Sequence, residues 1–354
     1  MALAVFNGAY IGTRNTGIGV VSRELSKEFS KENILFLDPF SSGSDGNISI
    51  PSNLSPDYGL KAHLRRLYWI EKKIPRIIKQ ESVEFFLSPL PEAPLLSNVR
   101  SAVLVHDLLP LRFPEVSPLL AYHFFYVRLV ISKAELVFCN SNATAMELHE
   151  FFKVPVSKLI PIKLGFDRKK FFPVYEKREN FFLVLGRHNP HKNLKRVIQA
   201  FSLVKDQTFK LYFVGPFDKR YTPRLIKYSE ELGVSKNCIW KNWVTEDEKI
   251  RLLNTCKSLL ILSLWEGFGL PALEAMACRT PVIASNRGAL PEVVGNDGLL
   301  VDPINIEGIT EAMEYVIGGG RSLHEIAEKG VLRSSQFDWR LTAKEIESVL
   351  QSVC

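Results

Sequence analysis

The feature that most constrains the fold of this chain is a repeated order of short apolar segment, glycine-containing loop and amphipathic helical stretch. Its clearest instance begins with Ser258 to Leu264, which is apolar, bounded by polar residues and typical of a buried strand in a parallel sheet. Two glycines then bracket Phe268, where the backbone can adopt positive φ, and Pro271 is well placed to begin a helix. Strands that alternate with helices in this way predict the α/β class with parallel sheets.

The length and composition fit two domains of ordinary size. The chain has 354 residues, of which 46% are hydrophobic, which is enough for two cores. No apolar run approaches the length of a membrane span. Met1 leads into a strand-like segment without a basic region or a cleavage site. We therefore predict no secretory signal and a cytoplasmic location, with a peripheral position at the inner face of the membrane as an option.

The net charge of +7 and the pI near 9.0 raise the question of a nucleic-acid partner. Such a partner requires a localised basic surface, whereas the excess of Lys and Arg is spread evenly over both halves of the chain. The cysteines are odd in number and scattered without a CxxC pair, which disfavours a disulfide framework and a zinc site. We therefore predict no nucleic acid and no metal.

Two glutamates accompany the loop around Phe268. Glu266 lies in the loop, and Glu274 falls on the predicted helix about one turn after Pro271, so both carboxylates can point into one crevice. The amides at the start of a helix favour an anion, but carboxylates would repel it unless they bind neutral hydroxyls. A nucleotide sugar has both an anionic diphosphate and neutral hydroxyls. Alternatively, Glu266 is an exposed loop residue and Glu274 merely complements the helix dipole.

Between Glu266 and Glu274 the chain resembles the Glu-x7-Glu motif of retaining glycosyltransferases with the GT-B fold. Among these it is similar to the large family 4, also called group 1, and to its bacterial mannosyltransferase-like branch. The resemblance implies two facing Rossmann-like domains with parallel sheets and an interdomain cleft. It assigns residues 1–167 to an N-terminal acceptor-binding domain, 168–336 to a C-terminal nucleotide-sugar-binding domain, and 337–354 to a C-terminal helix that crosses back to the first domain.

A second segment, from Gly186 to Leu194, places Arg187 and Lys192 just before a predicted helix. Acidic residues normally occupy that end of a helix, so the basic side chains indicate a ligand with negative charge. The segment resembles the Gly-Arg-x4-Lys-Asn sequence of family 4, in which the Arg and Lys contact the donor diphosphate. Without a ligand, the segment would be an ordinary loop.

The resemblance also assigns the remaining donor contacts. It implies that Glu274 binds the ribose and that Glu266 holds the transferred sugar. The backbone of the intervening loop would hold the sugar together with Glu266, through Gly267, Phe268, Gly269 and Leu270.

Near the N-terminus, Gly17 and Gly19 follow the strand-like segment Ala2 to Asn7. Glycines at such a turn let backbone amides approach a phosphate. The full GxGxxG spacing is absent because Ser22 occupies the third position, which disfavours a dinucleotide site. The glycines therefore either contact the nucleotide sugar or only form a tight turn.

The pair His106 and Asp107 follows the predicted strand Ser101 to Val105, at the end where parallel sheets carry ligand-binding groups. His106 can hydrogen-bond a sugar hydroxyl or meet charge that develops at the reacting carbon, with Asp107 orienting it. Alternatively, the two residues close a loop beside Pro110. The segment His106 to Pro114 again resembles the mannosyltransferase-like branch of family 4, which implies a catalytic role for His106.

Residues 61–80 are basic, aromatic and helical in pattern, with Pro75 as a possible kink. Such a segment suits contact with an anionic membrane, through residues such as Lys72, Lys73 and Arg76. The alternative is a solvated face of a helix that packs on the core. An apolar stripe is predicted to face that core, formed by Leu64, Leu67, Ile70, Ile74, Ile77 and Ile78.

Three other segments carry local expectations. Residues Pro39 to Leu60 are rich in turn-forming residues and predict a long loop, and residues 168–180 lack a pattern and suit a hinge. Arg279 stands where relatives of family 4 usually have glycine, so we expect it to adopt a left-handed conformation.

The resemblance implies a retaining glycosyltransferase that moves a hexose from a nucleotide-diphosphate sugar, GDP-mannose or a UDP-sugar, to a glycan or lipid-linked acceptor. Bacterial polysaccharide assembly is the expected setting. No DxD set suits magnesium, so the reaction is predicted to need no metal and no cofactor. The alternative is a catalytically inactive GT-B-fold protein that binds sugar or lipid. A phosphorylase, an epimerase or a glycoside hydrolase with paired carboxylates are further alternatives.

Overall fold

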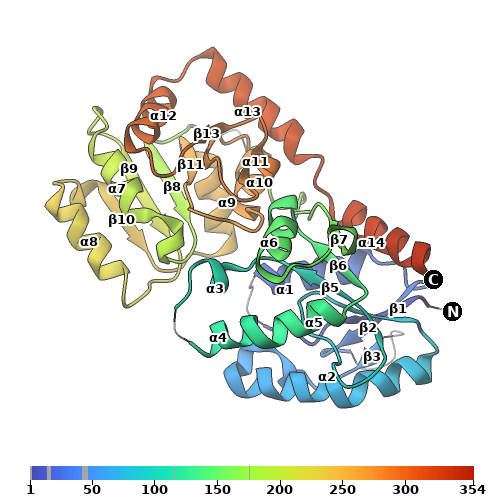
Figure 1. Cartoon of the computed structure of the whole chain (residues 1–354). Helices are drawn as coiled ribbons and strands as arrows, with labels where there is room; N and C mark the ends of the chain where they lie inside the picture. The colour runs from blue at the N-terminus through green and yellow to red at the C-terminus, as the bar shows by residue number, and fades with distance from the viewer. Residues whose placement is uncertain (1, 14–16, 42–46, 116, 175) are drawn as a thin grey trace. The chain divides into compact units, whose positions relative to one another are not determined.

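The computed structural model describes residues 2–13, 17–41, 47–115, 117–174 and 176–354. The chain forms two compact units, shown in Figure 1. The first unit consists of Met1–Gly165 together with Asp338–Cys354, and the second of Phe166–Phe337. Each unit is an α/β body with its own parallel sheet.

The sheet of the first unit has seven strands among the described residues, and every neighbouring pair is parallel. Its order is β3-β2-β1-β4-β5-β6-β7, so the chain reverses its direction of travel across the sheet between β1 and β4. The strands are β1 (Ala4–Asn7), β2 (Ile34–Asp38), β3 (Ile48–Ser49), β4 (Phe85–Ser88), β5 (Arg100–Val105), β6 (Leu136–Cys139) and β7 (Leu159–Pro161).

Helices cover the sheet of the first unit and bury its apolar strands. The last helix, α14, packs against α1, and its Glu347 carboxylate accepts hydrogen bonds from the Ser30 amide at 2.7 Å and from Asn33 Nδ2 at 2.8 Å. The helices are α1 (Gly17–Glu28), α2 (Gly59–Glu81), α3 (Leu109–Arg112), α4 (Pro118–Ala121), the π-helix η3 (Tyr122–Val127), α5 (Arg128–Lys133), α6 (Asn142–Phe152) and α14 (Trp339–Val353). Short 3-10 turns are η1 (Ser52–Leu54), η2 (Pro56–Tyr58) and η4 (Val156–Lys158).

The second unit repeats this plan with six parallel strands in its described residues. The order β10-β9-β8-β11-β12-β13 reverses between β8 and β11. The strands are β8 (Phe181–Leu185), β9 (Lys210–Val214), β10 (Cys238–Lys241), β11 (Ser258–Ile261), β12 (Val282–Ser285) and β13 (Leu299–Val301). The helices and 3-10 turns are η5 (Pro190–Lys192), α7 (Leu194–Ser202), α8 (Thr222–Glu231), η6 (Ser235–Asn237), α9 (Glu246–Thr255), α10 (Leu270–Ala277), α11 (Leu290–Val294), α12 (Ile306–Gly318) and α13 (Arg321–Ser334).

The predicted α/β class with parallel sheets is confirmed. The predictions for α2 are partly wrong. Pro75 lies inside one continuous helix, and Leu64, predicted to face the core, is 60% exposed. Ile70 and Ile74 are buried, as predicted, and the other buried residues of α2 are Ala62 and Arg66, so that the four follow one another at four-residue steps. An arginine therefore occupies a position on the core side of this helix.

The local expectations have mixed outcomes. Arg279 adopts φ +57°, so the expected left-handed conformation is confirmed. Much of the expected hinge is fastened to the second unit, because Phe171 is buried and Arg178 donates hydrogen bonds to the Cys256 and Arg279 carbonyls at 2.9 and 2.7 Å. The expected loop from Pro39 to Leu60 contains β3, η1 and η2, and its residues 42–46 lie outside the described residues.

The cysteines of the described chain are free thiols. Cys139, Cys238, Cys256 and Cys278 are buried and Cys354 is exposed. No helix in the described ranges is long and apolar enough to span a bilayer.

Candidate functional site

The candidate site of the second unit lies where the strand order reverses, between β8 and β11. The loops at the carboxyl ends of two such strands form the crevice in which doubly wound sheets bind ligands. Hydrogen bonds tie these loops together here: Asn193 Nδ2 donates to the Leu262 carbonyl at 3.1 Å, and the Leu264 amide donates to the His191 carbonyl at 2.7 Å. The segments that carry Arg187, Lys192 and Glu266 are thereby held side by side.

Lys192 and Glu266, both predicted site residues, form an ion pair at this edge. The Lys192 Nζ donates to Glu266 Oε1 at 2.6 Å, and Ser263 Oγ donates to the same oxygen at 2.5 Å. Burial raises the pKa of the Glu266 carboxyl, but the charge and hydrogen bond of Lys192 outweigh it, so this pKa lies below its ordinary value. Glu266 is therefore ionised and balances the ammonium charge.

The backbone of Glu266 is fixed by the segment that follows β12. Gly288 has φ +61°, and a Cβ there would lie 2.6 Å from the Glu266 carbonyl oxygen. The Ala289 amide donates to that same oxygen at 3.0 Å. Only glycine fits both the left-handed conformation and the close approach, so the position of Glu266 depends on Gly288.

Arg187 lies in the same loop as Lys192, a few residues earlier, and is exposed. No hydrogen bond or ion pair of its guanidinium occurs among the described residues. Its charge acts on Asp218, whose pKa is lowered mainly by hydrogen bonds from Arg220 and to a smaller extent by Arg187. Arg187 thus carries a permanent positive charge, and its N–H donors are available to a ligand.

Glu274 is paired with a residue that the sequence did not single out. The Nζ of Lys249, on α9, lies 2.7 Å from Glu274 Oε1 and 2.6 Å from Oε2. Burial raises the pKa of the Glu274 carboxyl above its ordinary value, although Lys249 opposes the shift. The two glutamates of the motif therefore have separate lysine partners. Lys249 occupies an ordinary position in a charged helix, so no sequence signal distinguishes it.

The loop between the two glutamates offers backbone rather than side chains. Phe268 is buried, with its ring 6.1 Å from that of Phe337, and Gly267 is also buried. Gly269 adopts φ +109°, a conformation that suits glycine, and precedes α10, which begins at Leu270 with Pro271 as its second residue. The helix thus begins one residue before the predicted start.

Gly17, Gly19 and His106 belong to the first unit. Both glycines lie in the first turn of α1, and the preceding residues 14–16 are outside the described part of the chain. A Cβ at Gly17 would meet no atom within 4 Å, so a ligand can approach the helix there.

His106 follows β5, as predicted, and its ring is held by a backbone carbonyl. The Nε2 lies 2.8 Å from the Pro89 carbonyl oxygen, and burial lowers the pKa of the ring to about 4. The ring is therefore neutral near pH 7. Since a carbonyl oxygen only accepts hydrogen bonds, Nε2 carries the proton of the neutral ring, and Nδ1 can accept a hydrogen bond from a hydroxyl. Asp107 Oδ1 accepts a hydrogen bond from the Leu109 amide at 3.0 Å, at the start of α3.

His106 and Asp107 line a pocket of about 510 Å³ within the first unit. Its wall includes Leu60, Leu90 and Leu119, and its polar residues include Arg66 and Glu92. The pocket therefore combines apolar walls with hydrogen-bonding groups, the composition typical of small-molecule sites.

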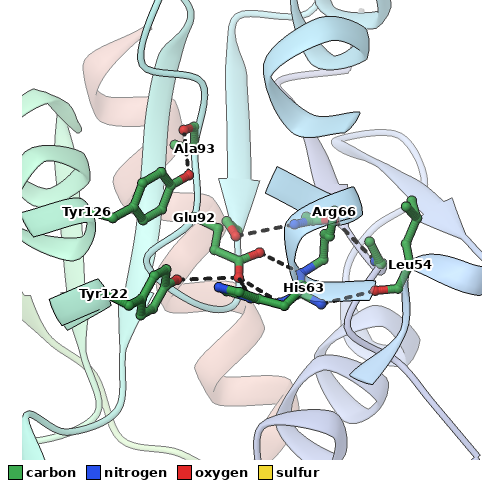
Figure 2. Close-up of polar contacts among 10 residues, drawn as sticks. Leu54, His63, Arg66, Glu92, Ala93, Tyr122 and Tyr126 are labelled. Atoms are coloured by element: carbon green, nitrogen blue, oxygen red, sulfur yellow. Dashed lines mark hydrogen bonds and ion pairs between the residues drawn. The ribbon is translucent and has the colours of Figure 1, made fainter. Parts of the chain in front are cut away.

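Arg66 and Glu92 form a buried ion pair that the sequence analysis missed, shown in Figure 2. Arg66 Nε donates to Glu92 Oε2 at 2.6 Å, Nη2 donates to Oε1 at 2.7 Å, and Nη1 donates to the Leu54 carbonyl at 3.0 Å. Their side chains are 2% and 0% exposed. Burial raises the pKa of Glu92, but Arg66 outweighs it and the pKa falls below its ordinary value.

Two tyrosines and a histidine complete this network (Figure 2). Tyr122 donates to Glu92 Oε1 at 3.4 Å, Tyr126 donates to the Ala93 carbonyl at 3.3 Å, and Arg66 Nη2 lies 3.0 Å from His63 Nδ1. The available sequence signal was the position of Arg66, four residues after Ala62 and four before Ile70 on the buried side of α2.

Comparison with known proteins shows which family the second unit resembles. Residues 166–333 match the family described as "Glycosyl transferases group 1". The serotype-specific mannosyltransferase WbdA of Escherichia coli is 27% identical over 69% of this chain and 32% of its own length. The MMP alpha-(1->4)-mannosyltransferase of Mycolicibacterium hassiacum is 31% identical over 60% of this chain and 52% of its own length. The chain thus spans about a third to a half of these relatives.

Solved structures share the whole architecture. Sucrose-phosphate synthase from Thermosynechococcus elongatus has a TM-score of 0.75 at 16% identity, with 99% of this chain and 98% of that chain covered. Anabaena HepE in complex with UDP has a TM-score of 0.75 at 17% identity, with 99% and 100% covered. These similarities show the fold, which is GT-B with two Rossmann-like units. Residues 166–333, which carry the glutamate motif and the paired Lys192 and Glu266 and make up just under half of the chain, match the glycosyl transferases group 1 family, and the chain is similar to members of glycosyltransferase family 4.

Proposed function

We propose that this protein is a retaining glycosyltransferase that moves a hexose from a nucleotide-diphosphate sugar to a glycan or lipid-linked acceptor in bacterial polysaccharide assembly. The observation that carries the proposal is the Lys192–Glu266 pair, 2.6 Å apart at the reversal point of the second sheet, with the exposed Arg187 in the same loop. Cations and a carboxylate at this point suit a ligand that has a diphosphate and hydroxyls.

The leaving group of such a reaction is a nucleoside diphosphate, so its growing negative charge must be stabilised. Lys192 donates one of its three N–H groups to Glu266, and its other N–H groups can donate to phosphate oxygens. Arg187 adds a second cation. These two cations can stabilise the negative charge of the diphosphate in place of a metal ion, which supports a metal-independent reaction.

The carboxylates bind the neutral parts of the donor. Glu266, held ionised by Lys192, accepts hydrogen bonds from hydroxyls of the transferred sugar. Backbone groups of Gly267, Phe268, Gly269 and Leu270 hold the same sugar. Glu274 accepts hydrogen bonds from the hydroxyls of the ribose. Because Lys249 already balances its charge, Glu274 can do so without repelling the diphosphate.

Mannose is one candidate for the sugar, because the relatives named above are mannosyltransferases, and GDP-mannose is then the donor. UDP-sugars are the other, because HepE, which shares the fold, is described in complex with UDP and with UDP-glucose. The pocket around His106 supports the acceptor assignment to the first unit, because neutral Nδ1 can accept a hydrogen bond from a sugar hydroxyl.

The test is calorimetry with UDP, GDP, ADP, dTDP and their common sugar conjugates, run without metal on wild type, Lys192→Gln and Lys236→Gln. Lys236 is an exposed lysine of the same unit and serves as the matched control. We expect one nucleotide class to bind wild type and the control, and to bind Lys192→Gln at least about 10-fold more weakly, as for a lost charged hydrogen bond.

Binding to none of the ligands by a folded protein would overturn the proposal in favour of the inactive assembly protein. Release of free sugar at the rate of donor loss would indicate a hydrolase instead.

A further inference from the structure

The pocket of the first unit contains one permanent cation among the described residues that line it. That cation is Arg66, and no lysine belongs to the described lining. The other basic groups of the wall are histidines. Burial lowers the pKa values of His106 and His123 to about 4, so both rings are neutral near pH 7. The charge that a ligand meets in this pocket therefore depends on Arg66 and on the carboxylates beside it.

Neighbours within the unit occupy the Arg66 guanidinium (Figure 2). Its Nε and Nη2 donate to the two carboxylate oxygens of Glu92, and its Nη1 donates to the Leu54 carbonyl. Nη2 also lies 3.0 Å from His63 Nδ1, and because a guanidinium only donates, that nitrogen accepts. Glu92 is 0% exposed. An anion would therefore have to displace a buried carboxylate to pair with Arg66.

The carboxylates of the pocket outnumber its cation. Glu92 balances Arg66, whose charge holds the pKa of Glu92 below its ordinary value. Asp107 adds a second carboxylate to the wall. An anionic ligand would lose its hydration next to two negative groups without gaining a cation, which is strongly unfavourable. The electrostatics of the pocket therefore favour a ligand without negative charge.

The same wall offers several groups for neutral hydroxyls. Its hydrogen-bonding side chains include Tyr10, Tyr122 and the neutral His106. The wall also includes His123, which lies with Tyr122 on the π-helix η3, and π-helices occur frequently at functional sites. The buried Nδ1 of His123 has no hydrogen-bond partner among the described residues, and native structures rarely leave such an atom unsatisfied. A ligand with several hydroxyls suits this wall.

We propose that the pocket of the first unit selects an uncharged sugar residue of the acceptor, and that Glu92 and Asp107 exclude sugars that carry a carboxylate or a phosphate. This inference deepens the proposed transferase function and rests on it, because only transfer makes the bound sugar an acceptor. Any phosphate of a lipid-linked acceptor then lies outside the pocket. An earlier glycosyl transfer must therefore supply the acceptor with its neutral terminal sugar.

Pairs of sugars that differ only at C6 test the selection. Methyl α-glucoside and methyl α-mannoside are each compared with the uronate that has a carboxylate in place of the C6 hydroxymethyl group. Binding to the whole chain is titrated by ligand-observed NMR without a donor. We expect at least one neutral glycoside to bind at least about 100-fold more tightly than its uronate, because the anion is desolvated beside carboxylates.

Two variants change the charge of the pocket. Asp107→Asn keeps an oxygen that can accept the Leu109 amide, and it should reduce the preference for the neutral sugar by about 10-fold through loss of one repulsive charge. Glu92→Gln leaves the charge of Arg66 unbalanced and should reduce the preference further. Circular dichroism establishes that each variant is folded, and Asp107→Asn, which leaves the buried pair intact, decides the matter if Glu92→Gln does not fold.

Two further variants locate the binding and control for the loss of an acid. Leu119→Trp places a larger side chain in the pocket wall, at a residue that is 53% exposed, and should abolish binding of the neutral glycoside. Glu81→Gln removes an exposed carboxylate of α2 that does not line the pocket, and it should keep the wild-type preference.

Three outcomes would overturn the inference: wild type that binds the uronates as tightly as the neutral glycosides, wild type that binds no neutral glycoside, and an unchanged preference in folded Asp107→Asn. Calorimetry with the nucleotides on wild type separates these from failure of the proposed function. Nucleotide binding without a preference for neutral sugars removes only this inference. Binding of a neutral glycoside without nucleotide binding removes the transferase and leaves a sugar-binding pocket.

Discussion

Lys192 and Glu266 lie 74 positions apart in the sequence, yet their side chains form a 2.6 Å hydrogen bond at the reversal point of the second sheet. The contact exists because β8 and β11 are neighbours and their following loops leave the sheet at the same edge. Each residue also restrains the other, since the lysine keeps the carboxyl ionised and the carboxylate fixes the ammonium group.

Glu266→Gln should lower turnover by about 10- to 100-fold, since a charged hydrogen bond contributes roughly 1.5–3 kcal/mol. The amide keeps the size of the side chain but removes the charge that neutralises Lys192. Donor affinity should change less, because bonds change at the sugar that Glu266 is proposed to hold. Steady-state kinetics with Glu231→Gln, an exposed glutamate of α8, as control would check this. Full turnover in Glu266→Gln would contradict the assignment.

Glu274→Ala should weaken donor binding by about 10- to 100-fold through loss of its proposed ribose contact. Lys249→Gln, which removes only the partner of Glu274, should weaken binding less. Calorimetry with the preferred nucleoside diphosphate gives both affinities. If both variants bind like wild type, the pair only stabilises α9 against α10.

Arg66→Met should destabilise the first unit by about 3–5 kcal/mol, because it leaves the buried Glu92 charge without its partner. Arg65→Met is the natural control, since Arg65 is the next residue along α2 but is exposed, and its change should stay within about 0.5 kcal/mol. Urea unfolding of the whole chain measures both. The double variant Arg66→Met/Glu92→Met should recover part of the loss, and equal stability of the two arginine variants would refute a structural role for the pair.

Arg279→Gly should be more stable than Arg279→Ala by about 1 kcal/mol, because φ +57° strains any residue with a Cβ. Both variants lose the ion pair between Arg279 and Glu328, so their difference isolates the backbone. Thermal unfolding of the two proteins checks the prediction. An alanine variant as stable as the glycine variant would show that the strain is relieved elsewhere.

Stability should fall as the pH drops from about 6.5 to about 4. Burial lowers the pKa values of His106, His123, His188 and His191 to about 4, from an ordinary value of 6.5. Between these values the unfolded chain binds more protons than the folded one, so acid favours unfolding. Above pH 6.5 these groups contribute no pH dependence.

Unfolding temperatures of wild type, His188→Gln and His324→Gln at pH 7 and pH 5 would measure this effect. His188 is 1% exposed, whereas the ring of His324 is 66% exposed. The decrease between the two pH values should be smaller in His188→Gln than in the other two proteins. The same decrease in all three would exclude His188 from the acid response.

The sequence correctly predicted those features that depend on neighbouring residues in the chain. The strands before the loops of Arg187 and Glu266 are short apolar runs, and the glycines and prolines that follow mark loops and helix starts, so both loops could be placed. The left-handed conformation of Arg279 was expected on a different ground, the resemblance to family 4, whose members usually have glycine at this position.

The rest depends on partners that no local pattern reveals. The apolar periodicity of α2 could not show that the Leu64 side lacks a covering layer, nor that Arg66 would find Glu92, 26 residues away, inside the core. A charged residue in a sequence is expected to be solvent-exposed unless a partner of opposite charge is known. Lys249 was missed for the same reason, because its role depends on the packing of α9 beside α10.

The position of α14 determines the order in which the two units can fold during synthesis. The second unit is one uninterrupted stretch, Phe166–Phe337, whereas the first needs Asp338–Cys354 to complete the layer against α1. A ribosome therefore delivers the whole second unit before the first has all its elements. Until α14 emerges, the side of α1 that it covers stays open to solvent.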